Sequence, residues 1–126
     1  MSWPGIILDI VFTGKKTYGQ FLKSDEGIAT NVLASRLAFL KEEGILSKAP
    51  NPDDRRKDFY ELTEKGIDLI PILLNIVMWS AKHYSQSYVR PGSRLFEQLS
   101  LNPVQGIEEV KTLLRRGGCI FPATNE

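Results

Sequence analysis

The spacing of apolar and polar positions predicts a chain that begins with two helices. Residues 6–12 are apolar apart from one aspartate, and Gly14 ends the helix that this run predicts. A short helix is expected from Tyr18 to Lys23, because its apolar side chains recur three and four positions apart and Thr17 is a good N-cap. The polar run at positions 24–27 then predicts a turn into a further helix.

The next helix is predicted from about Ala29 to Glu43, and its two faces differ. Leu33, Leu37 and Leu40 are spaced at about one and two helical turns and form an apolar stripe that suits a core. The opposite face is small and polar near the start of the helix, at Thr30, Asn31, Ala34, Ser35 and Arg36. Gly44 follows at the position where a glycine commonly ends a helix.

Two short strands around a charged loop predict a β-hairpin after this helix. The strands are Ile45 to Lys48 and Asp58 to Leu62, and the loop between them holds two prolines, an asparagine and paired aspartates. Thr63 is the expected N-cap of the longest helix, Glu64 to Tyr84, inside which Pro71 predicts a kink. This helix is apolar on more than one face, so a second subunit is its natural partner.

The remaining chain is predicted to contain one more helix. Residues 85–100 are expected to form a loop with a short helical piece. Asn102 is a good N-cap for a helix from Pro103 to Arg116, which the glycines at 117 and 118 would end. We expect this helix to bury Val104, Ile107, Val110, Leu113 and Leu114. Residues 119–126 are expected to be a loose tail.

This order of elements predicts a mainly α-helical fold with a small β-hairpin. Helix, short helix, turn, longer helix, hairpin and long helix follow one another as in a winged helix-turn-helix protein, with C-terminal helices added. Residues 1–66 would form the DNA-binding region, and residues 67–126 the C-terminal helices expected to make a dimer. With 126 residues, both regions are expected to belong to one compact domain.

Composition adds little to this picture, and the distribution of charge adds more. Hydrophobic residues make up 42% of the chain and charged residues 25%, which is ordinary for a globular domain. The net charge is only +1, yet residues 15–57 carry nine basic and six acidic side chains, a net of +3. The remainder carries a net of −2. Such asymmetry is compatible with a DNA-facing surface, although a basic segment alone is more often a solvated face.

The compartment expected from the sequence is the cytoplasm, close to the nucleoid. No stretch approaches the length and apolarity of a membrane span, and the first residues lack the basic leader of a signal peptide. Cys119 is the single cysteine, so an internal disulfide is impossible.

The predicted layout places candidate DNA contacts on three elements. The helix at 29–43 would enter the major groove, where Asn31 suits adenine, Arg36 suits guanine or a phosphate, and Thr30 and Ser35 suit phosphates or thymine methyl groups. The hairpin tip would bring a basic cluster, Arg55, Arg56 and Lys57, to the phosphates or the minor groove. Asp53 and Asp54 would either reduce the positive charge of this cluster or pair with its arginines and shape the loop. A phosphate site is also expected at the start of the short helix, at Lys15, Lys16 and Thr17.

Four stretches of sequence resemble the HxlR family of bacterial regulators. They are GKKTYGQFLKS (14–24), GIATNVLASRLAFLKEEGILSK (27–48), DDRRKDFYELTEKG (53–66) and MWSAKHY (78–84). The resemblance covers about residues 6–84 and, more weakly, the last helix. The third stretch is also similar to the wing of MarR-type regulators, whereas the GIATN and MWSAKHY segments favour HxlR.

The resemblance implies a homodimeric DNA-binding repressor or activator of transcription that acts on an inverted repeat. Recognition would fall to Thr30, Asn31, Ser35 and Arg36, with wing contacts from the basic cluster at 55–57. Family members usually carry an extra helix ahead of the segment that starts here at Trp3, and that helix helps to build the dimer. A shortened or modified start is therefore expected.

Other function classes have weaker support in the sequence. An enzyme is disfavoured, because there is one histidine, His83, one cysteine, no glycine-rich phosphate loop and no metal-ligand spacing, so neither cofactor nor metal is expected. A protein-interaction module that keeps the winged fold without binding DNA would fit the low net charge.

A redox sensor would have to use Cys119, with only Arg115 and Arg116 nearby to acidify its thiol. A ligand-sensing regulator would place a small-molecule effector in a pocket lined by Met78, Trp79, His83 and Tyr84, which are more often core or interface residues.

Overall fold

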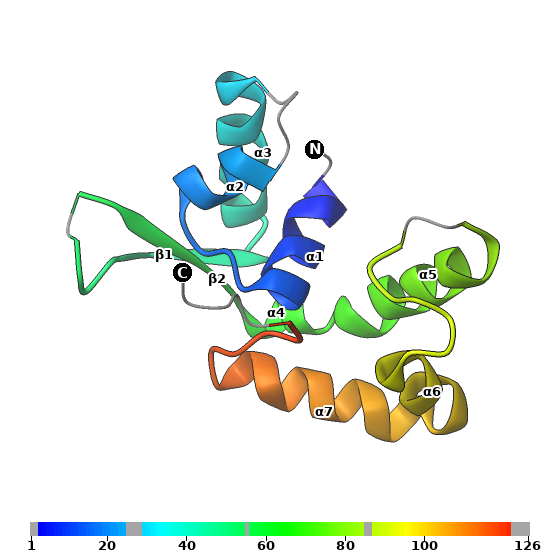
Figure 1. Ribbon diagram of the computed structural model, residues 1–126. Coiled ribbons are helices and arrows are strands. Elements are labelled where there is room, and N and C mark those ends of the chain that lie inside the picture. The colour runs from blue at the N-terminus through cyan, green and yellow to red at the C-terminus, as the bar shows by residue number, and fades with distance from the viewer. Residues whose placement is uncertain (1–2, 25–28, 55, 85–86, 122–126) are drawn as a thin grey trace.

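The computed structural model describes residues 3–24, 29–54, 56–84 and 87–121, and these residues are mainly helical (Figure 1). The chain begins with α1 (Trp3–Thr13), α2 (Tyr18–Ser24) and α3 (Thr30–Glu42). Figure 1 shows α1 between the α2–α3 pair and the C-terminal helices. This central position explains why most apolar residues of the first helix are buried.

The helix predicted for residues 29–43 is confirmed as α3 with almost the same bounds. Its stripe of Leu33, Leu37 and Leu40 is buried, while the polar face is exposed. Gly44 ends the helix with a φ of +73°, a conformation that favours glycine because it has no Cβ. The turn predicted at 24–27 falls mostly outside the described residues.

The predicted hairpin is also confirmed, as an antiparallel pair of β1 (Leu46–Pro50) and β2 (Asp58–Leu62). Leu46 lies opposite Leu62 and Lys48 opposite Tyr60. The free edge of β2 is partly covered, because the Tyr60 amide donates a hydrogen bond of 2.7 Å to the carbonyl of Lys16. The hairpin therefore extends from the helical body with its base fixed to the segment before α2 (Figure 1).

The long helix expected from Glu64 to Tyr84 is wrong as a single element. The structure has a one-turn helix, α4 (Glu64–Ile67), followed by α5 (Ile70–His83). Pro71 lies in the first turn of α5 rather than at a kink inside a helix, and there its missing N–H costs nothing. Thr63 does cap α4 as predicted, because its hydroxyl accepts a hydrogen bond of 3.2 Å from the Gly66 amide.

The segment expected to be mostly loop contains a complete helix, α6 (Arg94–Leu101), capped by the Ser93 hydroxyl. It packs against α7 (Pro103–Arg115), whose cap is the predicted Asn102. The expected buried face of α7 is partly wrong: Val104 is 75% exposed and Leu113 is 36% exposed. Val110 is buried, and Ile107 and Leu114 pack at the edge of the core.

The part of the C-terminal tail that the structure describes is bound to α1 and is not loose. The amide of Ile120 donates to the carbonyl of Val11, and the amide of Phe121 to that of Phe12, both at 2.8 Å. The ring of Phe121 also lies 5.9 Å from that of Phe12. The earlier expectation failed because isolated tail sequence does not reveal that the last carbonyls of α1 need donors. Residues 122–126 lie outside the described residues.

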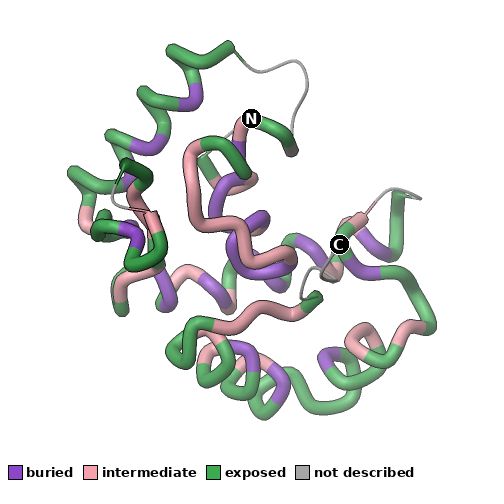
Figure 2. The backbone as a smooth tube through the Cα atoms, turned by 60° about the vertical axis from the view of Figure 1, so that its left-hand side comes forward, coloured by how far each residue is buried: buried purple, intermediate pink, exposed green. Residues whose placement is uncertain are grey.

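One hydrophobic cluster joins the elements, and it is centred on α1, the inner face of α3 and α5 (Figure 2). Among its largest fully buried side chains are Phe12, Phe21, Leu33, Leu46 and Ile70. Because these residues come from α1, α2, α3, β1 and α5, the core fixes the helix-turn-helix relative to the base of the hairpin.

Candidate DNA-binding surface

The N-terminal half of α3 presents a polar surface to solvent. Thr30, Asn31, Ser35 and Arg36, the four residues predicted to face DNA on this helix, are all exposed. The Tyr18 hydroxyl of α2 donates a hydrogen bond of 2.9 Å to the carbonyl of Thr30, which fixes the start of α3 against α2. The four polar side chains are therefore carried by a helix whose other face is held in the core.

The start of α2 is held by a reciprocal cap. The Thr17 hydroxyl accepts a hydrogen bond of 3.2 Å from the Gln20 amide, and the Gln20 side-chain oxygen accepts from the amides of Lys16 and Thr17 at 2.8 and 3.1 Å. This is a capping box, in which two backbone donors are satisfied together. Thr17 was identified from the sequence, but Gln20 was not, although the Thr-x-x-Gln spacing was visible.

The side chains of the two lysines before α2 have different neighbours. The ammonium of Lys15 lies 3.9 Å from the carboxylate of Asp9, a buried acid of α1. The ammonium of Lys16 lies over the ring of Phe59 on β2, 5.7 Å from its centroid. The sequence grouped these residues by proximity along the chain, and it could not show that each side chain finds a different partner.

Of the two aspartates expected to pair with the arginines at the hairpin tip, Asp54 does so. The guanidinium of Arg56 lies 3.2 Å from the Asp54 carboxylate, and this side-chain hydrogen bond lowers the pKa of the Asp54 carboxyl. The Asn51 side chain accepts a hydrogen bond of 2.8 Å from the Asp53 amide. Arg56 and Lys57 are exposed, so the tip still offers two cations to solvent. Arg55 lies outside the described residues.

A further ion pair stiffens the two strands. The Lys48 ammonium lies 3.3 Å from the Asp58 carboxylate on the neighbouring strand. The hydrogen bond to Asp58 and the charge of the Asp58 and Tyr60 side chains raise the pKa of Lys48. Both partners are at the surface, so the pair contributes little to stability, but it sets how much positive charge the hairpin shows.

A cleft of about 450 Å³ separates α2 from the hairpin. Its cations are Lys23, Arg56 and Lys57, and its acid is Asp58. Residues 17–20, at the start of α2, line the other side of this cleft. The sequence pattern indicates Lys23 only as the end of a short helix, so its place in this cleft is visible only in the fold. Basic side chains and a helix start on facing walls suit a phosphate-bearing strand.

Of the four residues expected to line an effector pocket, three lie at the surface and one packs against the core. Trp79, His83 and Tyr84 are exposed, and their rings contact one another, with centroids 5.0 Å apart for Trp79 and His83 and 5.7 Å apart for Trp79 and Tyr84. Met78 packs against the core instead. Trp79 lines a shallow hollow of about 350 Å³ with Ile72 and Ile76.

The described part of the chain contains no helix that is long and apolar enough to cross a membrane. Likewise, no three His, Cys, Asp or Glu side chains within the described ranges gather in a way that would hold a metal ion.

Comparisons with known proteins point to transcription regulators. The chain is 33% identical over 81 residues to an uncharacterised helix-turn-helix transcriptional regulator, Mb3122, of Mycobacterium bovis; the match covers 64% of this chain and 51% of that protein, so the chain spans about half its length. It is 26% identical over 96 residues to the helix-turn-helix transcriptional regulator YodB of Bacillus subtilis, covering 76% of this chain and 81% of that one.

Two solved structures share the fold. PA1607, a proposed transcription factor, is 36% identical with a TM-score of 0.54, over 64% of this chain and 58% of that one. The transcriptional regulator Tm0710 from Thermotoga maritima is 22% identical with a TM-score of 0.52, over 90% of this chain and 75% of that one.

The family model for the HxlR-like helix-turn-helix matches residues 1–88, which include α1 to α5 and the whole hairpin. Its members are transcriptional regulators and not enzymes, in agreement with the class expected from the sequence. The chain therefore belongs to the HxlR-like helix-turn-helix family.

Proposed function

We propose that this chain binds double-stranded DNA sequence-specifically, as a homodimer on an inverted repeat, and so regulates transcription. The observation that carries the proposal is the exposed polar half of α3, which is rigidly held between α2 and the core. A helix of this diameter fits the major groove, and short polar side chains at its start allow the backbone to approach the base edges.

Each surface has a separate role in this proposal. Asn31 and Arg36 read bases, and Thr30 and Ser35 contact phosphates or thymine methyl groups. The cleft between α2 and the hairpin takes one strand, with Lys23, Arg56 and Lys57 near its phosphates. Residues 1–66 are thus the DNA-binding region and residues 67–126 supply the dimer contacts.

An exposed apolar stripe on α5 supports the dimer. Ile72, Ile76 and Trp79 are each more than half exposed and lie at i, i+4 and i+7 on one face of that helix. An apolar stripe of this kind is costly in water and is typical of a surface that a second subunit covers. A two-fold dimer would present two copies of α3, with half-sites about one helical turn, ~10 bp, apart or a multiple of that.

The test is a gel-shift experiment on genomic fragments at several salt concentrations. Affinity should fall steeply as salt rises, because phosphate contacts release counterions. Arg56→Ala should weaken all sequences alike, and Asn31→Ala should relax preference at one base pair, each by about 1–3 kcal/mol. Arg94→Ala, an exposed cation on α6, is the charge-matched control and should change nothing.

A protein-interaction module is the second candidate, and the charge of the hairpin favours it. Asp54 and Asp58 offset Arg56 and Lys48 by direct ion pairs, so the hairpin is less basic than its arginines and lysines suggest. The absence of any salt-sensitive DNA binding in the gel-shift experiment would favour this candidate and reject the regulator that binds DNA.

A further inference from the structure

A second cleft, of about 520 Å³, lies between the base of the hairpin and the C-terminal turn of α7. One wall is the end of β2, at Tyr60, Glu61 and Leu62, and the opposite wall is formed by residues 114–118. The volume is within the range of small-molecule sites, which is roughly 300–1,000 Å³. Neither the recognition helix nor the surface proposed for the dimer contributes to it.

Polar and apolar side chains both line this cleft, and the apolar ones belong to the core. Ile10 of α1 and Ile67 of α4 are both buried in the core and reach its floor. Leu62 and Leu114 are half-buried and pack at the edge of the same core. The Tyr60 ring completes the lining. An occupant would therefore need an aliphatic or aromatic body to displace water from these side chains.

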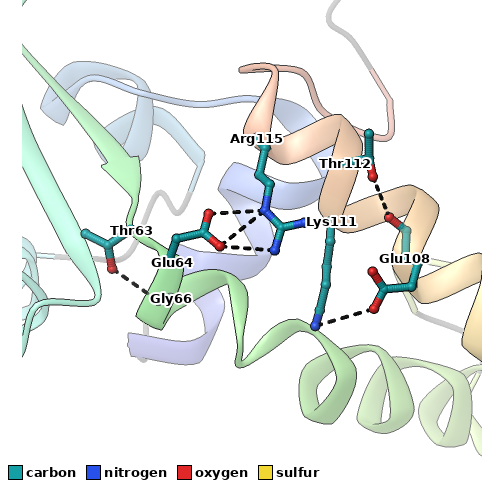
Figure 3. Close-up of polar contacts among 7 residues, drawn as sticks. All are labelled: Thr63, Glu64, Gly66, Glu108, Lys111, Thr112 and Arg115. Atoms are coloured by element: carbon teal, nitrogen blue, oxygen red, sulfur yellow. Dashed lines mark hydrogen bonds and ion pairs between the residues drawn. The ribbon is translucent and has the colours of Figure 1, made fainter.

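The charged side chains around the cleft leave an excess of positive charge. Arg115 is paired with Glu64, since its guanidinium donates to both carboxylate oxygens at 3.0–3.2 Å (Figure 3). This pair lowers the pKa of Glu64 and joins α7 to the start of α4. Among the described residues, neither Lys16 nor Arg116 has an ion-pair partner. Glu61, which is exposed, is the acid left to oppose these two cations.

The Lys16 ammonium lies close to the chain segment that contains Arg116. A Cβ placed on Gly117 would be 3.7 Å from the Lys16 ammonium, so this ammonium lies beside the backbone that directly follows Arg116. The glycines at 117 and 118 line the cleft without adding side chains of their own. One carboxylate could accept hydrogen bonds from both cations, and such charge-assisted hydrogen bonds are the strong ones in proteins.

We propose that this cleft binds a small organic monocarboxylate with an apolar or aromatic body. The carboxylate lies between Lys16 and Arg116, and the body lies against Leu62, Ile67 and Leu114. The site is separate from the aromatic group at 78–84 that the sequence suggested for an effector.

Occupancy of the cleft would alter DNA binding, and this consequence rests on the proposed function. β2 forms one wall of the cleft and continues directly into the hairpin tip, and Lys16 is hydrogen-bonded to β2 through its carbonyl. A ligand that shifts β2 therefore changes DNA affinity, and by linkage DNA changes the affinity for the ligand by the same factor.

Binding is tested first on the full chain without DNA, by calorimetry and by amide chemical-shift mapping. The probes are benzoate, phenylacetate and 2-naphthoate, with benzamide as the uncharged analogue. We expect saturable binding of at least one carboxylate, with shifts at residues 60–62 and 114–118, and binding of benzamide weaker by about tenfold or more. Equal binding of benzamide, shifts confined to α5, or no binding at millimolar concentration would overturn the proposal.

Substitutions of the two cations test where the carboxylate of the ligand binds. Lys16→Ala and Arg116→Ala should each weaken the carboxylate by about fivefold or more, and Arg116→Lys should recover part of the loss. Arg94→Ala is the matched control and should bind normally. Unchanged affinity in both alanine variants, with their folds intact by circular dichroism, would remove the proposed role of the two cations.

The regulatory consequence is measured separately, by titrating DNA with and without the bound carboxylate. A failure of DNA binding leaves the calorimetric result unaffected, so the two proposals fail independently. If DNA binds and its affinity does not change when the cleft is saturated, the coupling through β2 is wrong.

Discussion

At the residue scale, Gly66 shows how closely two backbones approach. It lies in α4, and a Cβ at this position would collide with the carbonyl of Ile45, a backbone atom that cannot rotate away. Gly66→Ala should therefore lower the free energy of unfolding by about 1–3 kcal/mol, despite the better helix propensity of alanine. Urea denaturation measures this change.

Gly19 is the matched control, because it also lies in a short helix, and no atom lies within 4 Å of a Cβ placed there. Gly19→Ala should raise stability by about 0.5–1 kcal/mol. If Gly66→Ala were equally stabilising, the proposed collision of its Cβ with the Ile45 carbonyl would be rejected.

Tyr88 is held protonated by its surroundings. Burial, together with the charge and hydrogen bond of Asp9, raises its pKa to about 12, and its hydroxyl lies 3.1 Å from the Asp9 carboxylate. The ring stacks on Phe12 with centroids 4.9 Å apart. Since the folded pKa is above the unfolded value of about 10, this interaction stabilises the fold below pH 10 and is lost between about pH 10 and 12.

Alkaline absorbance titration should therefore show one of the four tyrosines ionising late. Tyr88→Phe should remove the late step and flatten the fall in stability above pH 10. The loss should be on the order of 1 kcal/mol, because the side chain is partly exposed and screened by solvent. Tyr84→Phe should retain the late step, and a late step that survives in Tyr88→Phe would reject the assignment.

At the element scale, capping decides where the C-terminal helices begin. The Asn102 side chain accepts a hydrogen bond of 3.3 Å from the Gln105 amide at the start of α7. Asn102→Ala should cost about 1 kcal/mol and speed hydrogen exchange in the first turn of α7. Ser100→Ala, an exposed position on α6, should have little effect. Unchanged exchange at Gln105 and Gly106 in the first variant would show that the cap is not needed.

The sequence predicted elements well where one local signal was sufficient. The stripe on α3, the glycine after it and the hairpin were all visible in short-range spacing, and so was the cap of α7. The break between α4 and α5 was not, because a proline inside an apolar run is compatible with either a kink or a new helix. Val104 was predicted buried from periodicity, which cannot show that α7 turns that end away from the core.

The candidate site was predictable in part for the same reason. Thr30, Asn31, Ser35 and Arg36 share one face of one helix, so helical spacing alone placed them together. The environments of Lys15 and Lys16 depend on Asp9 and Phe59, which come from other elements. Contacts between distant segments carry no short-range pattern, so these partners appeared only in the folded chain.

At the scale of the whole molecule, the exposed stripe of α5 governs assembly. Ile76 lies at its centre and is 55% exposed. If this stripe is the dimer surface, Ile76→Glu should give a monomer in sedimentation experiments at micromolar concentration, because a charge would be buried without a partner. DNA affinity should fall with it.

Val104 on α7 is a suitable control for this experiment, since it is also apolar and even more exposed. Val104→Glu should leave the association state unchanged. A monomer from Val104→Glu together with a dimer from Ile76→Glu would move the interface from α5 to the tip formed by α6 and α7.

The hydrogen bonds that residues 120 and 121 donate to α1 have a consequence for synthesis on the ribosome. The two bonded segments are more than a hundred positions apart, so the last carbonyls of α1 receive these donors only when nearly all of the described chain has been made. Closing such a long loop is slow and entropically costly. α3 and the hairpin can therefore collapse early, while the first helix to be translated is among the last to be completed.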